Sequence, residues 1–468
     1  MTREVSLPLW VAAVVAVLAA WAALDRLLIP SARWLLRRRV NRVLEELNTR
    51  LRIRIPPFKL TKRQVLIDRL LYDPEVQDAA EAFARENDMP REAVMDRVRR
   101  SAREIVPAFN AYLYFRLGYR AGRAVARSLF RVRLGYLDEG ALSAIPENAT
   151  VVFWINHRSN MDYILVGYLA AERTALSYAV GEWARIWPLQ TLIRSMGAYF
   201  VRRRSNDPLY RRVLERYVGM ATAGGVTQAI FPEGGLTRDG ALREPKLGLV
   251  DYMLKNFDPS GERDVVFIPV GINYDRVFED RSQLRLASEP ENLPRPGEVL
   301  WKSLGFMLRN ARLMLANRWH RFGYACVNFG PPVSARAYLR ERGLDLRALP
   351  REARFAEIGA FARDMMRRLG DVIPAVPVAL VATALLVDPG RAMSELELKG
   401  EVVALSRRLE EKGAHVYIPR GDQDYAIAVG IRMLTLRRLV AVRDGLFCVR
   451  PAEVPLLAYY ANSIRHLL

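Results

Sequence analysis

The chain has 468 residues, of which 51% are hydrophobic and 26% charged. These values exclude an intrinsically disordered protein and predict one large domain with a smaller one beside it. The formal net charge is +20, and all but seven of the 71 basic residues are arginine, so we expect anionic partners such as phosphate-bearing molecules, acidic proteins or anionic lipids. Cys326 and Cys448 cannot form a disulfide framework and belong to no Cys/His cluster, which indicates a reducing compartment and no zinc site.

Residues 5–24 carry no charge, and as a helix they would span roughly 30 Å, the thickness of a hydrocarbon core. We therefore predict a membrane-anchor helix over residues 1–30. Five arginines follow between residues 26 and 39, and the positive-inside rule predicts that the rest of the chain lies on the cytoplasmic face. A cleaved signal peptide is the alternative, although Arg3 and Glu4 are not a positively charged leader; seven alanines also leave room for an interfacial helix.

Residues 31–140 have a helical pattern, with apolar residues three and four positions apart. Examples are Ile105, Phe109, Tyr112, Leu113 and Leu117. We interpret the region as a helical layer packed on the next domain. Arginine and aromatic residues interleave from 111 to 133, so a membrane-surface face is the alternative.

Residues 141–390 alternate strand-like and helix-like segments, which predicts an α/β sandwich. The expected strands are 151–155, 197–202, 226–231, 264–272 and 323–329. The apolar segment 375–387 has only thirteen residues, too few to cross a membrane, so it is a buried helix or a lipid-facing patch.

Residues 391–468 form a small, mainly helical C-terminal domain in this interpretation. Helices are expected over 394–412 and 422–436, with a hairpin over 439–449 around Asp444 and Gly445. This order resembles a winged helix and raises a nucleic-acid hypothesis. The second helix has no basic recognition face and the chain has a predicted anchor, so we expect no nucleic-acid partner.

The segment 156–162, Asn-His-Arg-Ser-Asn-Met-Asp, follows the first of the strands expected in 141–390. With His157 on the turn and Asp162 in the first turn of the next helix, the carboxylate would reach the imidazole. Such a pair can take the proton of an alcohol that attacks a thioester, while the carboxylate holds the ring's tautomer. Ser159 or Asn160 could cap the helix. An isolated histidine after a strand is more often structural, so further segments must support the assignment.

Three further segments share the same strand-and-loop pattern. Residues 197–204 end in Arg202, Arg203 and Arg204, which could bind a phosphate bidentately or form a solvated strand end. Residues 228–240 lead into a glycine-rich loop with one acid and one base, where backbone N–H groups can approach a ligand; a plain hairpin would explain only the glycines. Residues 265–274 are a continuous apolar run, typical of a central strand.

In this order, the four segments resemble the glycerolipid acyltransferase superfamily, most closely the bacterial and mitochondrial type of glycerol-3-phosphate acyltransferase. Lys246, in Pro245-Lys246, and the C-terminal segment 459–468 extend the resemblance to roughly residues 95–468. It implies an α/β acyltransferase domain in which His157 is the general base and Asp162 orients it. The substrate-binding residues it implies are Arg158, Ser159, Arg202, Arg203, Glu233, Gly234, Gly235, Arg238 and Lys246. Glu233 would bind an acceptor hydroxyl or close the loop through backbone N–H groups.

One departure concerns the third segment, where the family usually has Glu-Gly-Gly-Arg-Ser-Arg and this chain has Leu236, Thr237 and Arg238 after the glycines. A lysophosphatidate acyltransferase therefore stays open as the alternative. The main expectation is a membrane-bound enzyme that moves an acyl group from acyl-CoA or acyl carrier protein to the sn-1 hydroxyl of glycerol-3-phosphate. The resemblance implies no metal or cofactor. The positive charge predicts an anionic lipid membrane as partner, and the anchor with the arginines after it predicts a place on the cytoplasmic face of the inner membrane.

Overall fold

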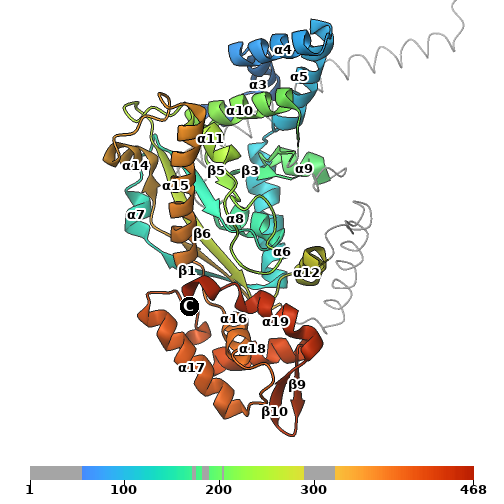
Figure 1. The fold of residues 1–468 in the computed structure, drawn as a ribbon, viewed down its shortest axis with the longest axis vertical. Helices are drawn as coiled ribbons and strands as arrows, with labels where there is room; N and C mark the ends of the chain where they lie inside the picture. Colours follow the sequence, from blue (N-terminus) through green and yellow to red (C-terminus); the bar gives the residue numbers. More distant parts are fainter. Residues whose placement is uncertain (1–54, 171–174, 182–188, 203–204, 289–321) are drawn as a thin grey trace, which may run out of the picture. The chain divides into compact units, whose positions relative to one another are not determined.

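A sheet of eight strands organises the described part of the chain (Figure 1). The computed structural model describes residues 55–170, 175–181, 189–202, 205–288 and 322–468. The strand order is β1-β7-β6-β2-β5-β3-β4, with β8 paired to β6. The strands are β1 Arg131–Leu137, β2 Thr150–Ile155, β3 Ser177–Val180, β4 Tyr199–Phe200, β5 Gln228–Ile230, β6 Val265–Tyr274, β7 Tyr324–Phe329 and β8 Val333–Ser334.

Five neighbouring strands run parallel to one another: β2, β3, β4, β5 and β6. Strand β7 is antiparallel to β6 and parallel to β1. All residues of β2 and β6 are buried, which explains their uninterrupted apolar sequences. Because the five strands share one direction, their carboxyl ends meet at one edge of the sheet. In open α/β sheets this is the edge where ligands bind.

The α/β prediction is confirmed, and all five expected strands are present, although the second is reduced to two residues. The prediction of helix throughout 31–140 was wrong at β1. This strand lies at the sheet edge with most of its side chains exposed, so its alternating basic and apolar residues lack the apolar run of a central strand. The sequence reading also missed β3.

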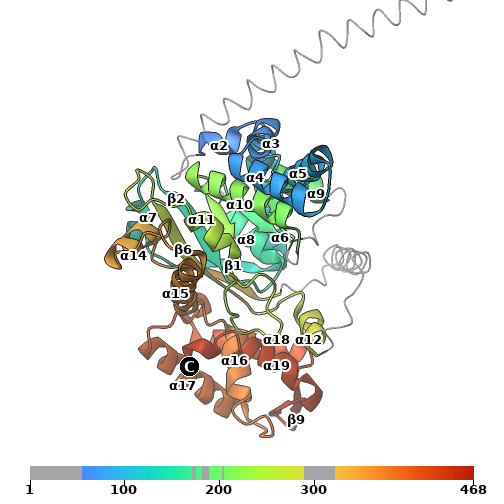
Figure 2. The same cartoon turned by 45° about the horizontal axis from the view of Figure 1, so that its top comes forward.

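Helices α2 to α6 form the predicted N-terminal helical layer. They are α2 Pro57–Leu60, α3 Arg63–Leu71, α4 Pro74–Glu86, α5 Arg91–Ile105, a π-helix η1 Leu113–Gly118 and α6 Tyr119–Leu129. The Asp73 side chain caps α4 by accepting from the N–H of Val76. Helix α5 buries Val94, Val98 and Ala102, spaced four residues apart, and packs on α10 (Pro208–Ala223), which lies beside these helices in Figures 1 and 2.

The other helices of the α/β domain connect and cover the strands. They are α7 Glu139–Ser143, α8 Met161–Ala170, α9 Leu189–Ser195, α11 Gly248–Leu254, α12 Asp280–Ser288, α14 Ala335–Glu341 and α15 Arg351–Asp371. Helix α15 lies against β2 and β6, and the Phe361 ring centroid is 5.0 Å from that of Phe267 and 6.5 Å from that of Trp154. These aromatic contacts form part of the core on one face of the sheet.

The C-terminal elements contain the two expected helices and the hairpin (Figure 1). They are α16 Pro377–Leu385, α17 Glu395–Glu411, α18 Gln423–Leu436, β9 Val440–Arg443, β10 Leu446–Val449 and α19 Val454–Ala461. Asp444 and Gly445 both have positive φ, as a type I′ turn requires. Within 375–387, α16 is a buried helix rather than a lipid-facing patch. It packs on α17, α18 and α19, although it precedes the predicted boundary at residue 390.

The predicted anchor helix, residues 1–30, lies outside the described residues. Among the helices that are described, none is long and apolar enough to cross a membrane. The anchor therefore stays a prediction.

Candidate active site

The His157–Asp162 pair lies at the carboxyl end of β2. Asn156 extends the pairing of β2 with β6, because its side-chain amide both donates to the carbonyl and accepts from the N–H of Ile272, each at 2.8 Å. The chain then turns, and α8 begins with Asp162 in its first turn. His157 Nδ1 lies 2.9 Å from Asp162 Oδ2, and the two side chains are 1% and 0% exposed. The sequence prediction of the pair is confirmed in its geometry.

The Asp162 carboxylate has four donors in fixed positions. Oδ2 accepts from His157 Nδ1 and from the N–H groups of Arg158 and Ser159, at 2.8 and 3.0 Å. Oδ1 accepts from Tyr274 Oη at 2.5 Å. A carboxylate only accepts, so the proton of a neutral imidazole is on Nδ1, and Nε2 carries the basic lone pair. The arrangement therefore prepares Nε2 as a general base.

Two aromatic rings fix the plane of the imidazole. The centroids of the Phe231 and His157 rings are 4.2 Å apart, with an interplanar angle of 32°. The Tyr163 ring meets the His157 ring edge-on, with 5.3 Å between the centroids. Tyr163 Oη is 3.5 Å from Nε2. An alcohol that approaches Nε2 must therefore approach beside the Tyr163 hydroxyl.

The loop after β5 holds both backbone polar groups of His157. Glu233 Oε1 accepts from the His157 N–H at 2.8 Å, and the Thr237 N–H donates to the His157 carbonyl at 3.0 Å. Burial raises the pKa of the Glu233 carboxyl to about 8, although the hydrogen bond from His157 opposes the shift. Of the two roles considered for Glu233, Oε1 performs loop closure, while Oε2 has no hydrogen-bond partner among the described residues.

The glycine-rich loop is shaped by two glycines with positive φ, Gly234 and Gly240. A Cβ on Gly240 would lie 1.8 Å from the Tyr459 carbonyl oxygen, so only glycine lets the C-terminal helix approach. The Thr237 hydroxyl accepts from the Gly240 N–H and donates to the Ala241 carbonyl, and Asn462 Nδ2 donates to the Asp239 carbonyl at 3.0 Å. The departure at Thr237 is therefore a structural element of the loop.

The remaining predicted residues of this loop differ in exposure. Gly235 is buried, whereas Arg238 and Lys246 are exposed. The Lys246 side chain lies against the exposed Gly234, because its Cγ would be 2.9 Å from a Cβ built there. Two cations of the predicted set thus border the loop that holds the histidine.

Ser159 caps α8, and a residue that the sequence analysis missed holds it. Ser159 Oγ accepts from the Met161 N–H at 3.2 Å and donates to Glu279 Oε2 at 2.7 Å, while Glu279 Oε1 accepts from the Asn160 N–H at 3.1 Å. Glu279 follows β6 by five residues, outside any segment with an obvious motif. Tyr274 ends the segment 265–274, for which the sequence predicts only a central strand.

Arg158 is buried rather than open to solvent, with 3% of its surface exposed. Nη1 donates to the Gly240 carbonyl at 3.4 Å, and the guanidinium lies 5.3 Å from the Tyr459 ring centroid. Nε and Nη2 have no hydrogen-bond partner among the described residues. The side chain therefore supplies positive charge beneath the His157 loop.

Arg202, from the second segment, is held by a carboxylate. Arg202 forms a bidentate ion pair with Glu104, with Nε–Oε1 and Nη2–Oε2 distances of 2.9 and 2.6 Å. It follows β4, which is separated from β2 by β5 and β3, so about 14 Å of sheet lies between the two strands. Arg203 and Arg204 lie outside the described residues. Where the described part of the chain is concerned, no three His, Cys, Asp or Glu side chains form a metal site.

Comparisons with known families agree with this geometry. The family described as Acyltransferase matches residues 140–273, which contain the first three segments and all but the last residue of the fourth. The family described as the glycerol-3-phosphate acyltransferase C-terminal region matches residues 303–468. A solved structure, the 1-acyl-sn-glycerophosphate acyltransferase of Thermotoga maritima, is 17% identical, covers 54% of this chain and 77% of its own, and gives a TM-score of 0.31.

Three relatives are each named glycerol-3-phosphate acyltransferase. The Xanthomonas axonopodis pv. citri and Xylella fastidiosa (strain M23) proteins are both 27% identical over 442 residues, with 92% of this chain and 48% and 50% of theirs covered. The Shewanella denitrificans protein is 26% identical over 333 residues, with 68% and 39% covered. The chain thus spans about half the length of the curated relatives it matches, or less. By these matches, the chain is similar to acyltransferases over residues 140–273 and to the C-terminal region of glycerol-3-phosphate acyltransferases over residues 303–468.

Proposed function

We propose that this protein transfers an acyl group from a thioester to a hydroxyl of glycerol-3-phosphate, giving lysophosphatidic acid. The observation that carries the proposal is the buried His157–Asp162 pair, whose Nδ1 is held by a carboxylate with three further donors. It lies at the sheet edge where α/β proteins bind ligands. The family matches support the same assignment.

In the proposed reaction, Nε2 of His157 takes the proton of the acceptor hydroxyl as its oxygen attacks the thioester carbonyl. Asp162 stabilises the imidazolium that forms. The tetrahedral intermediate then breaks the carbon–sulfur bond, and the imidazolium returns the proton to the departing thiolate. The ester and the free thiol leave, and His157 is again neutral.

The acceptor phosphate is assigned to the exposed cations of the loop after β5. Arg238 and Lys246 lie on or beside the loop that holds both backbone groups of His157. A phosphate bound there would restrict the position of the hydroxyl relative to Nε2, which raises the rate through proximity. Arg202 is a poorer candidate, because Glu104 already neutralises its guanidinium.

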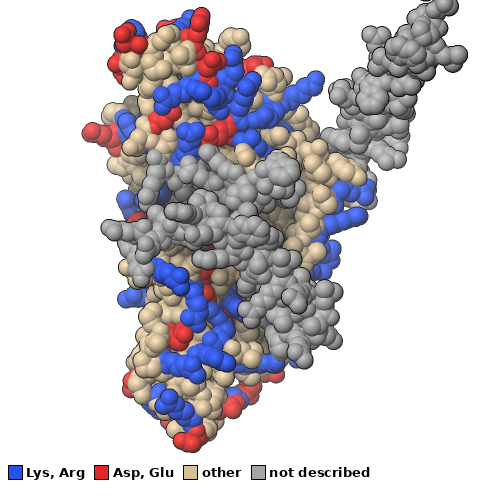
Figure 3. Space-filling view, turned by 90° about the vertical axis from the view of Figure 1, so that its right-hand side faces the viewer, with Lys and Arg blue, Asp and Glu red and all other residues tan. Residues whose placement is uncertain are grey.

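A membrane surface is the proposed location of the reaction. Figure 3 shows basic side chains spread over much of the viewed face. Along η1 and the start of α6, exposed Tyr112 and Leu117 alternate with exposed Arg116 and Arg120, a combination suited to an anionic lipid interface. Acyl-CoA and acyl carrier protein are both anionic and suit the same charge. The cytoplasmic face of the inner membrane follows from the predicted anchor.

Lysophosphatidate is the second candidate acceptor, because the half-buried, apolar Leu236 occupies a loop position where the family usually has arginine. We would incubate the purified protein in detergent with labelled acyl-CoA or acyl carrier protein, and offer glycerol-3-phosphate and lysophosphatidate in parallel. Product from glycerol-3-phosphate that is absent with His157→Ala would support the proposal. Product from lysophosphatidate alone would show that lysophosphatidate, rather than glycerol-3-phosphate, is the acceptor. No product from either acceptor would overturn the proposal of acyl transfer.

A further inference from the structure

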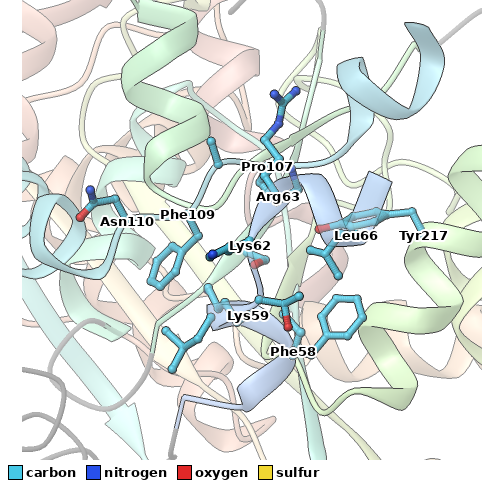
Figure 4. A pocket seen from close by; sticks show the side chains of 14 residues that line it. Phe58, Lys59, Lys62, Arg63, Leu66, Pro107, Phe109, Asn110 and Tyr217 are labelled. Atoms are coloured by element: carbon cyan, nitrogen blue, oxygen red, sulfur yellow. The ribbon is translucent and has the colours of Figure 1, made fainter. Parts of the chain in front are cut away.

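A polar cavity lies at the opposite edge of the sheet from His157. Its volume is about 330 Å³, and its walls come from residues 58–66, the segment 107–110, helix α10 and the starts of two strands (Figure 4). Ser177 begins β3 and Val226 precedes β5, so the cavity lies at the amino ends of parallel strands whose carboxyl ends face the His157 side. It is thus distinct from the site described above.

Among the described residues, three cations and no carboxylate line this cavity: Lys59, Lys62 and Arg63. Lys59 is 7% exposed, and its ammonium donates one hydrogen bond, to the Ala175 carbonyl at 2.7 Å. Arg63 also donates to backbone carbonyls, those of Val106 and Arg103. Lys62 is exposed and has no hydrogen-bond or ion-pair partner among the described residues. The positive charge of the cavity is therefore not neutralised by the surrounding described side chains.

A buried ammonium with a single carbonyl partner is costly, because one neutral acceptor does not replace its hydration. Burial accordingly lowers the pKa of Lys59 well below its usual value. The Phe109 ring, 4.6 Å from Nζ, offsets part of this cost through a cation–π contact. An anion in the cavity would offset much more, and would favour the protonated lysine.

The rest of the wall is mixed. Phe58, Leu66, Phe109 and Val226 are apolar, whereas Thr61, Asn110, Ser177 and Tyr217 carry polar groups. Leu60, which also lines the cavity, is 41% exposed. A cavity that has both cations and apolar side chains suits a lipid headgroup that carries a phosphate and is attached to hydrocarbon chains. A volume of about 330 Å³ lies at the lower end of the range for small-molecule sites, enough for a headgroup and its glycerol.

We propose that this cavity binds the phosphate head of an anionic glycerolipid, with Lys59 and Lys62 as the contacting cations and Leu60 against the start of the acyl chains. The proposal does not rest on the acyl-transfer assignment. It predicts a lipid site at the amino edge of the sheet that is occupied independently of the acceptor loop.

Lysine footprinting of the full chain tests this site directly. The purified protein in uncharged detergent would be acetylated with and without dihexanoyl phosphatidic acid, dihexanoyl phosphatidylcholine or inorganic phosphate, and mass spectrometry would follow each lysine. At ten times the dissociation constant, phosphatidic acid should slow acetylation of Lys59 and Lys62 about tenfold. Lys399, which is paired with Glu395 and Asp424, is the internal control, and Lys246 reports separately on the acceptor loop.

The variant Lys62→Met should abolish the protection of Lys59, and the matched variant Lys399→Met should preserve it. Protection of Lys246 alone, or equal protection by phosphatidylcholine, would overturn the proposal. No protection of Lys59 and Lys62 by phosphatidic acid would do the same. Protection by inorganic phosphate as strong as that by the lipid would identify an anion site but overturn the lipid assignment.

Discussion

A buried charged side chain has many hydrogen-bond partners at one edge of the sheet and few at the other. At the carboxyl edge, Asp162 has four donors, so the carboxylate and the imidazole it orients are held without a ligand. At the amino edge, Lys59 has one carbonyl and two aromatic rings, those of Phe109 and Tyr114. The first arrangement is preorganised, as catalysis requires, whereas the second is completed by a ligand. The difference indicates where chemistry occurs and where binding alone is expected.

Removing the base should produce the largest effect. We predict that His157→Ala lowers kcat by about 10²- to 10⁴-fold, because it removes Nε2, the base that Asp162 orients. Single-turnover acyl transfer would measure the loss. His415→Ala, a histidine that stacks on Tyr136 near β1, should keep full activity. Turnover of His157→Ala within tenfold of the unchanged protein would mean that the carboxyl edge is not the reacting edge.

The support of Asp162 can be tested with two tyrosines. Tyr274 Oη donates to Asp162, whereas the buried Tyr459 Oη has no partner among the described residues. Removing a hydrogen bond to a charged group costs about 2 kcal/mol. We predict that Tyr274→Phe lowers kcat roughly tenfold or more with little change in KM, because about 1.4 kcal/mol corresponds to a factor of ten.

Tyr459→Phe is the matched control and should leave kcat within about twofold, because it removes a hydroxyl without a partner in the described structure. Equal losses in both variants would show that packing, rather than the hydrogen bond to Asp162, maintains the pair.

Much of this site follows from its sequence, because local pattern determines it. His157 and Asp162 lie on one strand-turn-helix unit, and the distance between them is fixed by five residues of chain. Arg202 was expected at a phosphate site, but its pairing with Glu104 is a tertiary contact 98 residues apart that no local pattern indicates. The same holds for Glu279, which reaches Ser159 from 120 residues away. β1 was missed because an exposed edge strand lacks a buried apolar run.

Acid stability should reveal the buried carboxyl of Glu233. Its pKa rises from 4.5 to about 8 on burial, so between these values the folded protein binds more protons than the unfolded chain. The free energy of unfolding should therefore fall as pH rises through this window, by up to about 1.4 kcal/mol per pH unit from this group. We predict that Glu233→Gln removes this part of the slope in denaturant titrations between pH 5 and 7.

The control for this titration is Glu397→Gln. Glu397 lies in the capping box of α17, and its hydrogen bonds with Ser394 lower its pKa from 4.5 to about 2, so most of its titration lies below pH 5 in both the folded and the unfolded chain. The slope between pH 5 and 7 should not change in this variant. An unchanged slope in Glu233→Gln would show that the carboxyl is solvated in solution. Asp275, whose pKa burial raises to about 7, contributes a similar slope and stays intact in both variants.

We expect the smallest effect at Arg202. Its comparison with Lys246 separates a cation that has an ion-pair partner from a cation proposed to bind the acceptor phosphate. Glu104 holds the Arg202 guanidinium bidentately, whereas Arg238 and Lys246 border the loop beside His157. We predict that Lys246→Ala raises the KM for glycerol-3-phosphate about tenfold, the loss of roughly one charged contact. Arg202→Ala should change that KM less than about twofold and lower stability by at most about 1 kcal/mol, because its ion pair is partly exposed. If Arg202→Ala raised KM as much as Lys246→Ala, the Glu104 pair must open when the acceptor binds, and the acceptor site would extend across three strands of the sheet.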